Sequence, residues 1–308
     1  MSSEFKAIRL GKPFVTLEKI LNEEDLQKRV SPGNTQIDQR DFRAKALSEL
    51  KIVKQQATEN VASKLRLQPY LAPSSLSAYT LINDRIVTTI VKLVLDKMFP
   101  LVSPTKSERV AVMAVGGYGR AEMAPYSDVD LLFLTPYKQT AWGENVIESI
   151  LYLLWDLGLK VGHAVRNVEE SLRLARTDIT VRTALLENRF ISGEIELAQE
   201  FNVRLWSEVF ENTASEFISG KLKERDLRHE KQGSERYLLE PNIKEGKGGL
   251  RDLQTLYWIS KYVYKIKQKK DLIGFNIFSS DDLNLFSEAE DFLWTIRCAL
   301  HLFSNRAN

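Results

Sequence analysis

Residues 110–135 of the chain read VAVMAVGGYGRAEMAPYSDVDLLFLT. This stretch opens with an apolar run at 110–115 that contains several β-branched residues and predicts a short buried strand. The pair Gly116-Gly117 then predicts a turn. After a second turn centred on Pro125, the apolar run at 129–134 predicts another strand.

Two carboxylates, Asp128 and Asp130, stand at the start of the second predicted strand. Side chains at positions i and i+2 of a strand point to the same face, so we expect both acids to meet at one point. Adjacent carboxylates repel one another unless a cation lies between them, and proteins commonly bind Mg²⁺ through one or two carboxylates together with substrate phosphates. Asp128 and Asp130 are therefore our candidate catalytic and metal-binding residues.

The residues around this pair suit a phosphate group. Gly116 and Gly117 allow the backbone to approach a phosphate closely, with its N–H groups free to donate. Ser127 adds a hydroxyl, and the guanidinium of Arg120 can donate two hydrogen bonds to one phosphate. Each half alone is also typical of structural turns and solvated acids. Together, on two successive strands, they predict a site for a metal–nucleoside triphosphate.

At these residues the chain resembles the nucleotidyltransferase superfamily that includes DNA polymerase β. More closely, it is similar to the family of bifunctional PII uridylyltransferase/uridylyl-removing enzymes. The resemblance extends over about residues 35–306 and rests on five stretches: GGYGR at 116–120, PYSDVDLL at 125–132, WDLGLKVGHAVR at 155–166, LENR at 186–189 and PNIKEGKGGLRDLQ at 241–254.

The resemblance implies a reaction as well as a site. Two Mg²⁺ ions held by Asp128 and Asp130 would bridge UTP and a tyrosine hydroxyl of the PII nitrogen-regulatory protein, and pyrophosphate would leave. No residue in the sequence indicates uracil recognition, so UTP as the donor is implied by the resemblance alone. A nucleotidyltransferase of other specificity, such as an adenylyltransferase, is one alternative, and a non-catalytic nucleotide-binding regulatory module is another.

The rest of the pattern predicts an α+β fold, in which a small mixed sheet has helices on one side. We expect an N-terminal helical region at 1–100, a nucleotidyltransferase core at 101–193 and a mostly helical domain at 194–308. A third strand is expected at 159–166, after a helix that ends at Gly158. Further helices are expected at 38–65, from Ser74 or Ser75 to 98, at 141–157, from Thr177 or Asp178 to 186, and at 194–232, 250–268 and 281–303.

The third predicted strand lacks an acid. In the superfamily this strand commonly carries a third metal-binding carboxylate, whereas here its middle is Gly162-His163. Glu187, Glu245 and Asp252 are the candidates for the third ligand, and the sequence does not choose among them. Glu187 and Arg189 either form a structural ion pair or face the triphosphate. The missing acid is the reason to keep a non-catalytic module among the alternatives.

A second informative stretch is residues 242–249, NIKEGKGG, which holds three glycines and two lysines before a predicted helix. A glycine loop that leads into a helix N-terminus binds anions, so we expect Lys244 and Lys247 to contact the triphosphate or the leaving pyrophosphate. The alternative is an ordinary turn with exposed lysines. The charge-rich run at 221–231 has both signs interspersed, which indicates a solvated helix face.

Composition narrows the class of protein. Lys and Arg number 43 against 41 Asp and Glu, a net charge of +2 that argues against a general nucleic-acid binder. One cysteine and three histidines argue against an internal disulfide or a zinc centre. Without an apolar run of membrane-spanning length or a signal core, we expect a cytoplasmic protein and no membrane partner.

The related enzymes continue with a histidine-aspartate phosphohydrolase domain and glutamine-sensing ACT domains. This sequence contains neither, so we expect an isolated catalytic portion or a truncated gene product that lacks uridylyl-removing activity. Glutamine sensing would then depend on domains outside these 308 residues.

Overall fold

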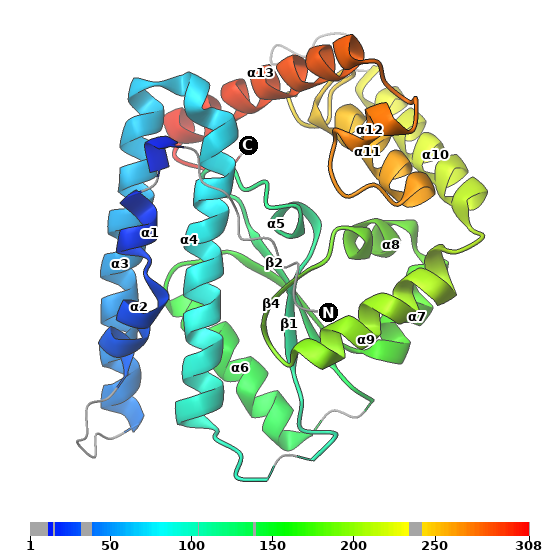
Figure 1. Cartoon of the computed structure of the whole chain (residues 1–308). Helices are drawn as coiled ribbons and strands as arrows, with labels where there is room; N and C mark the ends of the chain where they lie inside the picture. The colour runs from blue at the N-terminus through cyan, green and yellow to red at the C-terminus, as the bar shows by residue number, and fades with distance from the viewer. Residues whose placement is uncertain are drawn as a thin grey trace.

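The computed structural model describes residues 12–14, 16–31, 39–103, 105–137, 140–233 and 242–307. Its centre is a four-stranded sheet with the order β3-β2-β1-β4 (Figure 1). The strands are β1 (Ala111–Ala114), β2 (Val129–Thr135), β3 (Val161–Asn167) and β4 (Arg189–Gly193). β1 pairs antiparallel with β2 and β4, whereas β2 and β3 run parallel, so the sheet is mixed as expected.

The α+β fold is confirmed, but the expectation of helices on one side of the sheet is wrong. Val112 and Ala114 of β1 pack in one hydrophobic cluster with α4 (Ala72–Leu93) and α6 (Ala141–Asp156). Ala111 and Met113 point the other way, into a second cluster with α7 (Val168–Thr177), α8 (Ile179–Leu186) and α9 (Ile195–Leu205). Both faces are covered because β1 is apolar at every position, as is typical of a strand buried on both sides.

β4 was not predicted. Its sequence, RFISG, is short and does not alternate between polar and apolar residues, so it carries little strand signal. Its place beside β1 depends on Gly193, whose φ is +91° and where a Cβ atom would lie 2.3 Å from the carbonyl oxygen of Val110. Only glycine fits that approach.

The N-terminal helices form an antiparallel pair, α3 (Gln39–Leu67) and α4, against which α1 (Thr16–Ile20) and α2 (Glu23–Val30) lie (Figure 1). α4 begins earlier than predicted, after Leu71, and Ser75 is buried inside it with its hydroxyl donating to the carbonyl of Ala72. η2 (Pro69–Leu71) precedes α4, and a π-helical turn, η3 (Val94–Met98), ends it at the predicted residue.

The long helix expected at 194–232 is two helices. α9 and η4 (Trp206–Phe210) end before Asn212, which has a φ of +60°, and α10 (Ala214–Gly233) follows. Gly158, with a φ of +70°, follows the end of α6 as predicted. Asp178 caps α8. The remaining helices are α5 (Gly116–Gly119), α11 (Leu250–Tyr264), α12 (Asp271–Gly274) and α13 (Ser280–Ser304).

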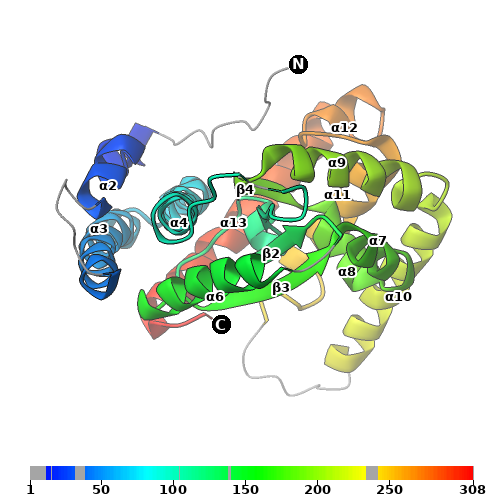
Figure 2. The same cartoon turned by 90° about the horizontal axis from the view of Figure 1, so that it is seen from below.

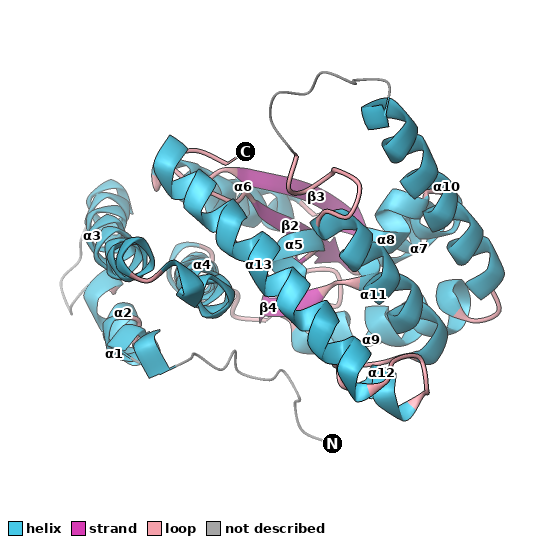
Figure 3. Cartoon of the chain, turned by 90° about the horizontal axis from the view of Figure 1, so that it is seen from above, coloured by secondary structure: helices cyan, strands magenta, loops and turns pink. Residues whose placement is uncertain are grey.

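α13 crosses the molecule from α11 and α12 at one end to α3 and α4 at the other (Figures 1 and 3). The view from below shows the sheet between α6 and α9 (Figure 2). The first hydrophobic cluster runs from Phe14 to Cys298 and so spans the boundaries expected at residues 100 and 193. Among the described helices, none is both long and apolar enough to cross a membrane.

Candidate active site

Asp128 and Asp130 lie at the edge of the sheet face that is covered by α8, α9 and α11. Asp130 is the second residue of β2 and pairs in register with Gly162 of β3. Val129 between the two acids is buried, which confirms that the acids alternate away from the core. Burial and the charge of Asp128 raise the pKa of Asp130, and Lys244 opposes this shift. With the residues that the structure describes, neither carboxylate forms a hydrogen bond or ion pair.

Gly162 explains why the third strand has no acid at this level. A Cβ atom there would lie 2.4 Å from Oδ1 of Asp130, so the carboxylate occupies the space that any side chain would need. The neighbouring His163 makes an edge-on contact with Trp155 on α6, with ring centroids 5.9 Å apart. The glycine in this strand therefore makes room for Asp130.

A tight turn delivers Asp128 to this point. The amide of Ser127 donates to the carbonyl of Ala124 at 3.2 Å, which confirms the turn predicted at Pro125. Tyr126 has a φ of +62°, a left-handed conformation that is unfavourable for a bulky side chain. Ser127 and Asp128 follow directly and both line the cleft described below.

The predicted Gly116-Gly117 turn is instead the start of a single helical turn, α5. Gly116 has a φ of +57°, and a Cβ atom on it would lie 3.6 Å from Oδ2 of Asp130, so this glycine faces the acid directly. Gly119 packs so tightly that a Cβ atom would lie 1.9 Å from the carbonyl oxygen of Glu187. The glycines thus serve close packing as well as access to the site.

A cleft of about 600 Å³ connects these elements to the C-terminal helices. It brings together most of the site residues predicted from sequence, namely Gly116, Gly117, Arg120, Ser127, Asp128, Asp130 and Lys244. Lys247 is exposed and does not line the cleft. The sequence did not single out the residues that complete the lining, which include Lys221, Arg228, Arg251, Trp258 and Arg297.

Arg120 lines the cleft, but Glu122 already compensates part of its charge. Its Nε donates to Oε2 of Glu122 at 2.9 Å, and its guanidinium lies 5.4 Å from the ring centroid of Trp258. Lys221 and Arg251 also lie over this ring, at 4.5 and 5.3 Å. The interpretation of residues 221–231 as a solvated face is therefore wrong for Lys221, which is 2% exposed.

The wall formed by α11, α13 and the loop before α11 carries surplus positive charge. Lys244 and Arg251 share one acid, Glu245, at 3.6 and 3.2 Å. Arg297 of α13 makes no ion pair with any described residue, and its Nε is buried without a hydrogen-bond partner there. Burial, together with the nearby guanidinium groups of Arg251 and Arg120, lowers the pKa of Arg297. Such a group favours an anionic ligand.

The three candidates for a third metal ligand lie apart from the aspartate pair. Glu187 is buried and pairs with Lys261 at 3.4 Å. Glu245 lines the cleft but serves Arg251 and Lys244, and Asp252 accepts hydrogen bonds from His229, Arg228 and the amide of Gly248. Within the described ranges, no three acids, histidines or cysteines are grouped to hold a metal.

Two carboxylates that have no partner among the described residues nevertheless fit a divalent cation of the Mg²⁺ type, whose remaining ligands are usually water and substrate phosphates. Arg189, by contrast, does not face the cleft. It forms a two-pronged ion pair with Asp84 of α4, at 2.8 and 3.0 Å, and so has a structural partner other than Glu187.

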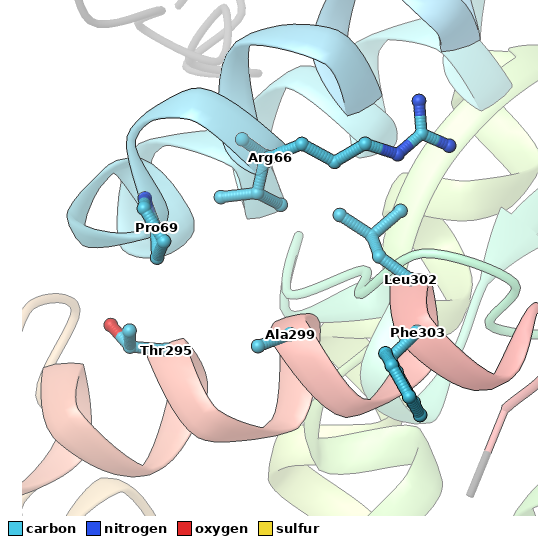
Figure 4. Close-up of a pocket in the computed structure, with 7 residues that line it drawn as sticks. Arg66, Pro69, Thr295, Ala299, Leu302 and Phe303 are labelled. Carbon is cyan, nitrogen blue, oxygen red and sulfur yellow. The ribbon is translucent and has the colours of Figure 1, made fainter.

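A second hollow, of about 380 Å³, lies between the end of α3, η2 and the last turns of α13 (Figure 4). Its lining is largely apolar, and Arg66 is its one charged residue among those described. In Figure 4 the guanidinium of Arg66 extends away from Pro69 and Thr295. With Arg66 as the one charged residue of its described lining, this hollow lacks the acids that a metal–phosphate site requires, so the cleft at Asp130 is the candidate active site.

Comparison with known proteins relates the chain to one family of enzymes. Residues 216–308 match the family model described as GlnD PII-uridylyltransferase. Over 271 residues, 88% of this chain, the sequence is 49% identical to the bifunctional uridylyltransferase/uridylyl-removing enzyme of Cereibacter sphaeroides. Over 266 residues, 86% of this chain, it is 51% identical to the protein of the same name from Ruegeria pomeroyi. The chain belongs to this uridylyltransferase/uridylyl-removing enzyme family.

The chain spans 29% of the length of each of these two relatives. The family model covers the positively charged wall of the cleft, since Lys244, Arg251 and Arg297 all lie in residues 216–308. The aspartate pair precedes that range. The cleft therefore joins the part that the family model matches to the sheet that carries the acids.

Proposed function

We propose that this family member transfers UMP from UTP to a tyrosine hydroxyl of a PII-type signalling protein and releases pyrophosphate, with Mg²⁺ as the cofactor. The observation that carries the proposal is the pairing of opposite charges across one cleft. Asp128 and Asp130, which have no ion-pair partner among the described residues, face a wall that contains Lys244, Arg251 and Arg297, and Arg297 likewise has no ion-pair partner within that part of the chain. A metal–triphosphate complex has the charges that both walls require.

In the proposed reaction the tyrosine oxygen forms a bond to the α-phosphorus of UTP. The bond from that phosphorus to the oxygen bridging to the β-phosphorus breaks, pyrophosphate leaves with the electron pair, and the hydroxyl proton passes to solvent. Asp128 and Asp130 would hold the metal, which when bound neutralises the phosphate oxygens and supports in-line displacement.

The chain's own residues position the reactants and stabilise charge. Gly116 and Gly117 leave room for the phosphates beside Asp130, and Ser127 offers a hydroxyl at the cleft wall. Lys244, Arg251 and Arg297 line the same cleft and would compensate the charge that develops on the leaving pyrophosphate. Base specificity and the protein acceptor rest on the family relationship.

The direct test incubates the protein with Mg²⁺, a purified PII protein and α-labelled UTP, beside a matched reaction with α-labelled ATP. We expect label to move from UTP to the PII protein. Asp130→Asn should reduce this transfer by about 10³-fold or more while leaving the circular dichroism spectrum unchanged. Asp96→Asn, an exposed aspartate outside the cleft, is the matched control and should transfer normally.

The same experiment separates the alternatives. Transfer from ATP in place of UTP would keep the site and replace the donor. Binding of Mg²⁺–UTP without any transfer would favour a nucleotide-binding regulatory module. Full activity of Asp130→Asn would show that the metal assignment is wrong.

A further inference from the structure

The C-terminal end of α13 forms hydrogen bonds with the turn at residues 124–127, which directly precedes Asp128. His301 is fully buried, and its Nδ1 lies 2.7 Å from the carbonyl oxygen of Pro125. A carbonyl oxygen can only accept, so Nδ1 carries the proton and donates it. Four residues further along, Asn305 accepts a hydrogen bond from the hydroxyl of Tyr126, at 3.2 Å. The residues in contact are 176 and 179 positions apart in the sequence.

One of these contacts is to the strained residue of the turn, Tyr126, and the other is to the residue before it, Pro125. Tyr126, with its φ of +62°, is the left-handed position of the 124–127 turn. A bulky residue keeps such a conformation only where its surroundings hold it there, and such residues concentrate at functional sites. The only hydrogen bond that the described residues make within the turn itself is Ser127 to Ala124, a long one at 3.2 Å. Beyond that bond and the burial of Ala124, the described hydrogen bonds that reach the turn come from His301 of α13 and from Asn305, the residue that follows this helix.

α13 is itself firmly anchored. Trp294 and Cys298 are buried in the first hydrophobic cluster, and the helix packs against η2, α3 and α4. Trp294, Arg297 and His301 follow one another at helical spacing on the side of α13 that faces the cleft and the turn. One face of this helix thus supplies part of the cationic wall and also fixes the loop on the opposite, acidic wall.

We infer that His301 and Asn305 are positioning residues that hold the 124–127 turn in its left-handed form and so keep Asp128 beside Asp130. The catalytic consequence of this inference rests on the proposed function, whereas the hold on the turn does not. If the contacts from His301 and Asn305 offset the backbone strain at Tyr126, a glycine at position 126 should make these contacts unnecessary, because glycine adopts the left-handed conformation without steric cost.

The test is a cycle of four proteins: wild type, His301→Ala, Tyr126→Gly and the double variant. Hydrogen–deuterium exchange over residues 123–130 reports the turn, and Mn²⁺ binding and transfer kinetics report the site. His301→Ala should speed exchange, weaken Mn²⁺ binding and lower kcat by about 100-fold, as a misplacement of about 1 Å does. KM for UTP should change much less. Adding Tyr126→Gly should restore slow exchange and most of kcat.

Three further variants sharpen the cycle. His301→Asn keeps a side-chain N–H donor and should retain much of the activity. Cys298→Ala alters the packing of α13 about one helical turn before His301 and removes neither hydrogen bond to the 124–127 segment. It should leave exchange at 123–130 and kcat near wild type. Asn305→Ala removes the second contact from an exposed position and should shift exchange in the same direction as His301→Ala, so it carries the test if His301→Ala fails to fold.

Two outcomes would overturn the inference. One is wild-type exchange and kcat in His301→Ala. The other is a loss that Tyr126→Gly does not repair, which would mean that His301 acts through packing alone. Absence of transfer in the wild-type protein would instead refute the proposed function, and the exchange measurements would then decide the role of His301 independently.

Discussion

Gly162 is the residue whose identity is most directly tied to the acid beside it. With Oδ1 of Asp130 only 2.4 Å from the position of a Cβ atom, Gly162→Ala should push the carboxylate out of place. We expect transfer to fall by about 100-fold, because misplacement of a reacting group by about 1 Å has that cost. Gly274→Ala, where a Cβ atom meets nothing within 4 Å, is the control and should be silent. Equal activity of the two variants would contradict the geometry.

The raised pKa of Asp130 has a consequence for stability in the absence of metal. Burial and Asp128 raise this pKa, so the folded protein binds the proton more tightly than the unfolded chain does. The free energy of unfolding therefore falls as pH rises from the usual pKa of aspartate, about 3.9, through the raised value, and then levels off.

Asp130→Asn removes this titration. Without divalent cations the variant should be more stable than wild type at about pH 7, and the difference should shrink as the pH approaches 4. Urea unfolding at the two pH values measures this. Added Mg²⁺ should stabilise wild type and leave the variant unchanged. A wild-type protein that is the more stable at neutral pH without metal would show that the acid is not strained by its neighbours.

At this scale, the sequence predicted the acidic side of the cleft better than the cationic side. Asp128, Asp130 and Gly116 are close in the chain, so spacing alone brings them together. Arg297 and Lys221 reach the cleft through helix packing, and no local pattern marks them. Lys221 even stands in a charge run that is typical of a solvated face, and it is buried because the packed helices place it over the ring of Trp258 and beside Glu224.

Among the elements, β4 depends on one arginine. Arg189 at its first position binds Asp84 of α4 through two hydrogen bonds and also donates to the backbone carbonyl oxygens of Tyr118 and Gly119. Lysine cannot reproduce this planar arrangement of donors. Arg189→Lys should lower the free energy of unfolding by about 1–3 kcal/mol in urea.

The matched control is Arg66→Lys, because the Arg66–Glu59 pair is exposed at 49% and 62% of the two side chains. Exposed pairs contribute about 0–1 kcal/mol, so the change should be small. A comparable loss in both variants would indicate a general effect of the substitution. β4 was missed for the same reason that Arg189 matters: tertiary contacts, more than the pattern of RFISG, make it a strand.

Across the whole molecule, the cleft combines residues from the sheet and from the C-terminal helices, so a bound nucleotide should stabilise both. At a concentration 100 times Kd, Mg²⁺–UTP should add about 2.7 kcal/mol to the free energy of unfolding. Lys244→Met should raise Kd about tenfold, because Lys244 lies in the cleft and acts on the charge of Asp130.

Lys247→Met provides the contrast, since Lys247 is exposed outside the cleft in the same loop. Thermal unfolding with a non-hydrolysable UTP analogue would measure both variants. Equal losses would restore the sequence-based expectation that both lysines contact the phosphates. From sequence the two lysines are indistinguishable, because the glycine-rich loop fixes which one points inward only after it packs.

The first hydrophobic cluster has a consequence for biosynthesis. It contains both Phe14 and Cys298, so the N-terminal helices lack part of their packing until α13 has left the ribosome. At about 5–20 residues per second, translation from the end of α4 at Leu93 to Cys298 takes roughly 10–40 seconds. During that interval the parts of α3 and α4 that α13 covers remain exposed, and the nascent chain is a candidate client for chaperones.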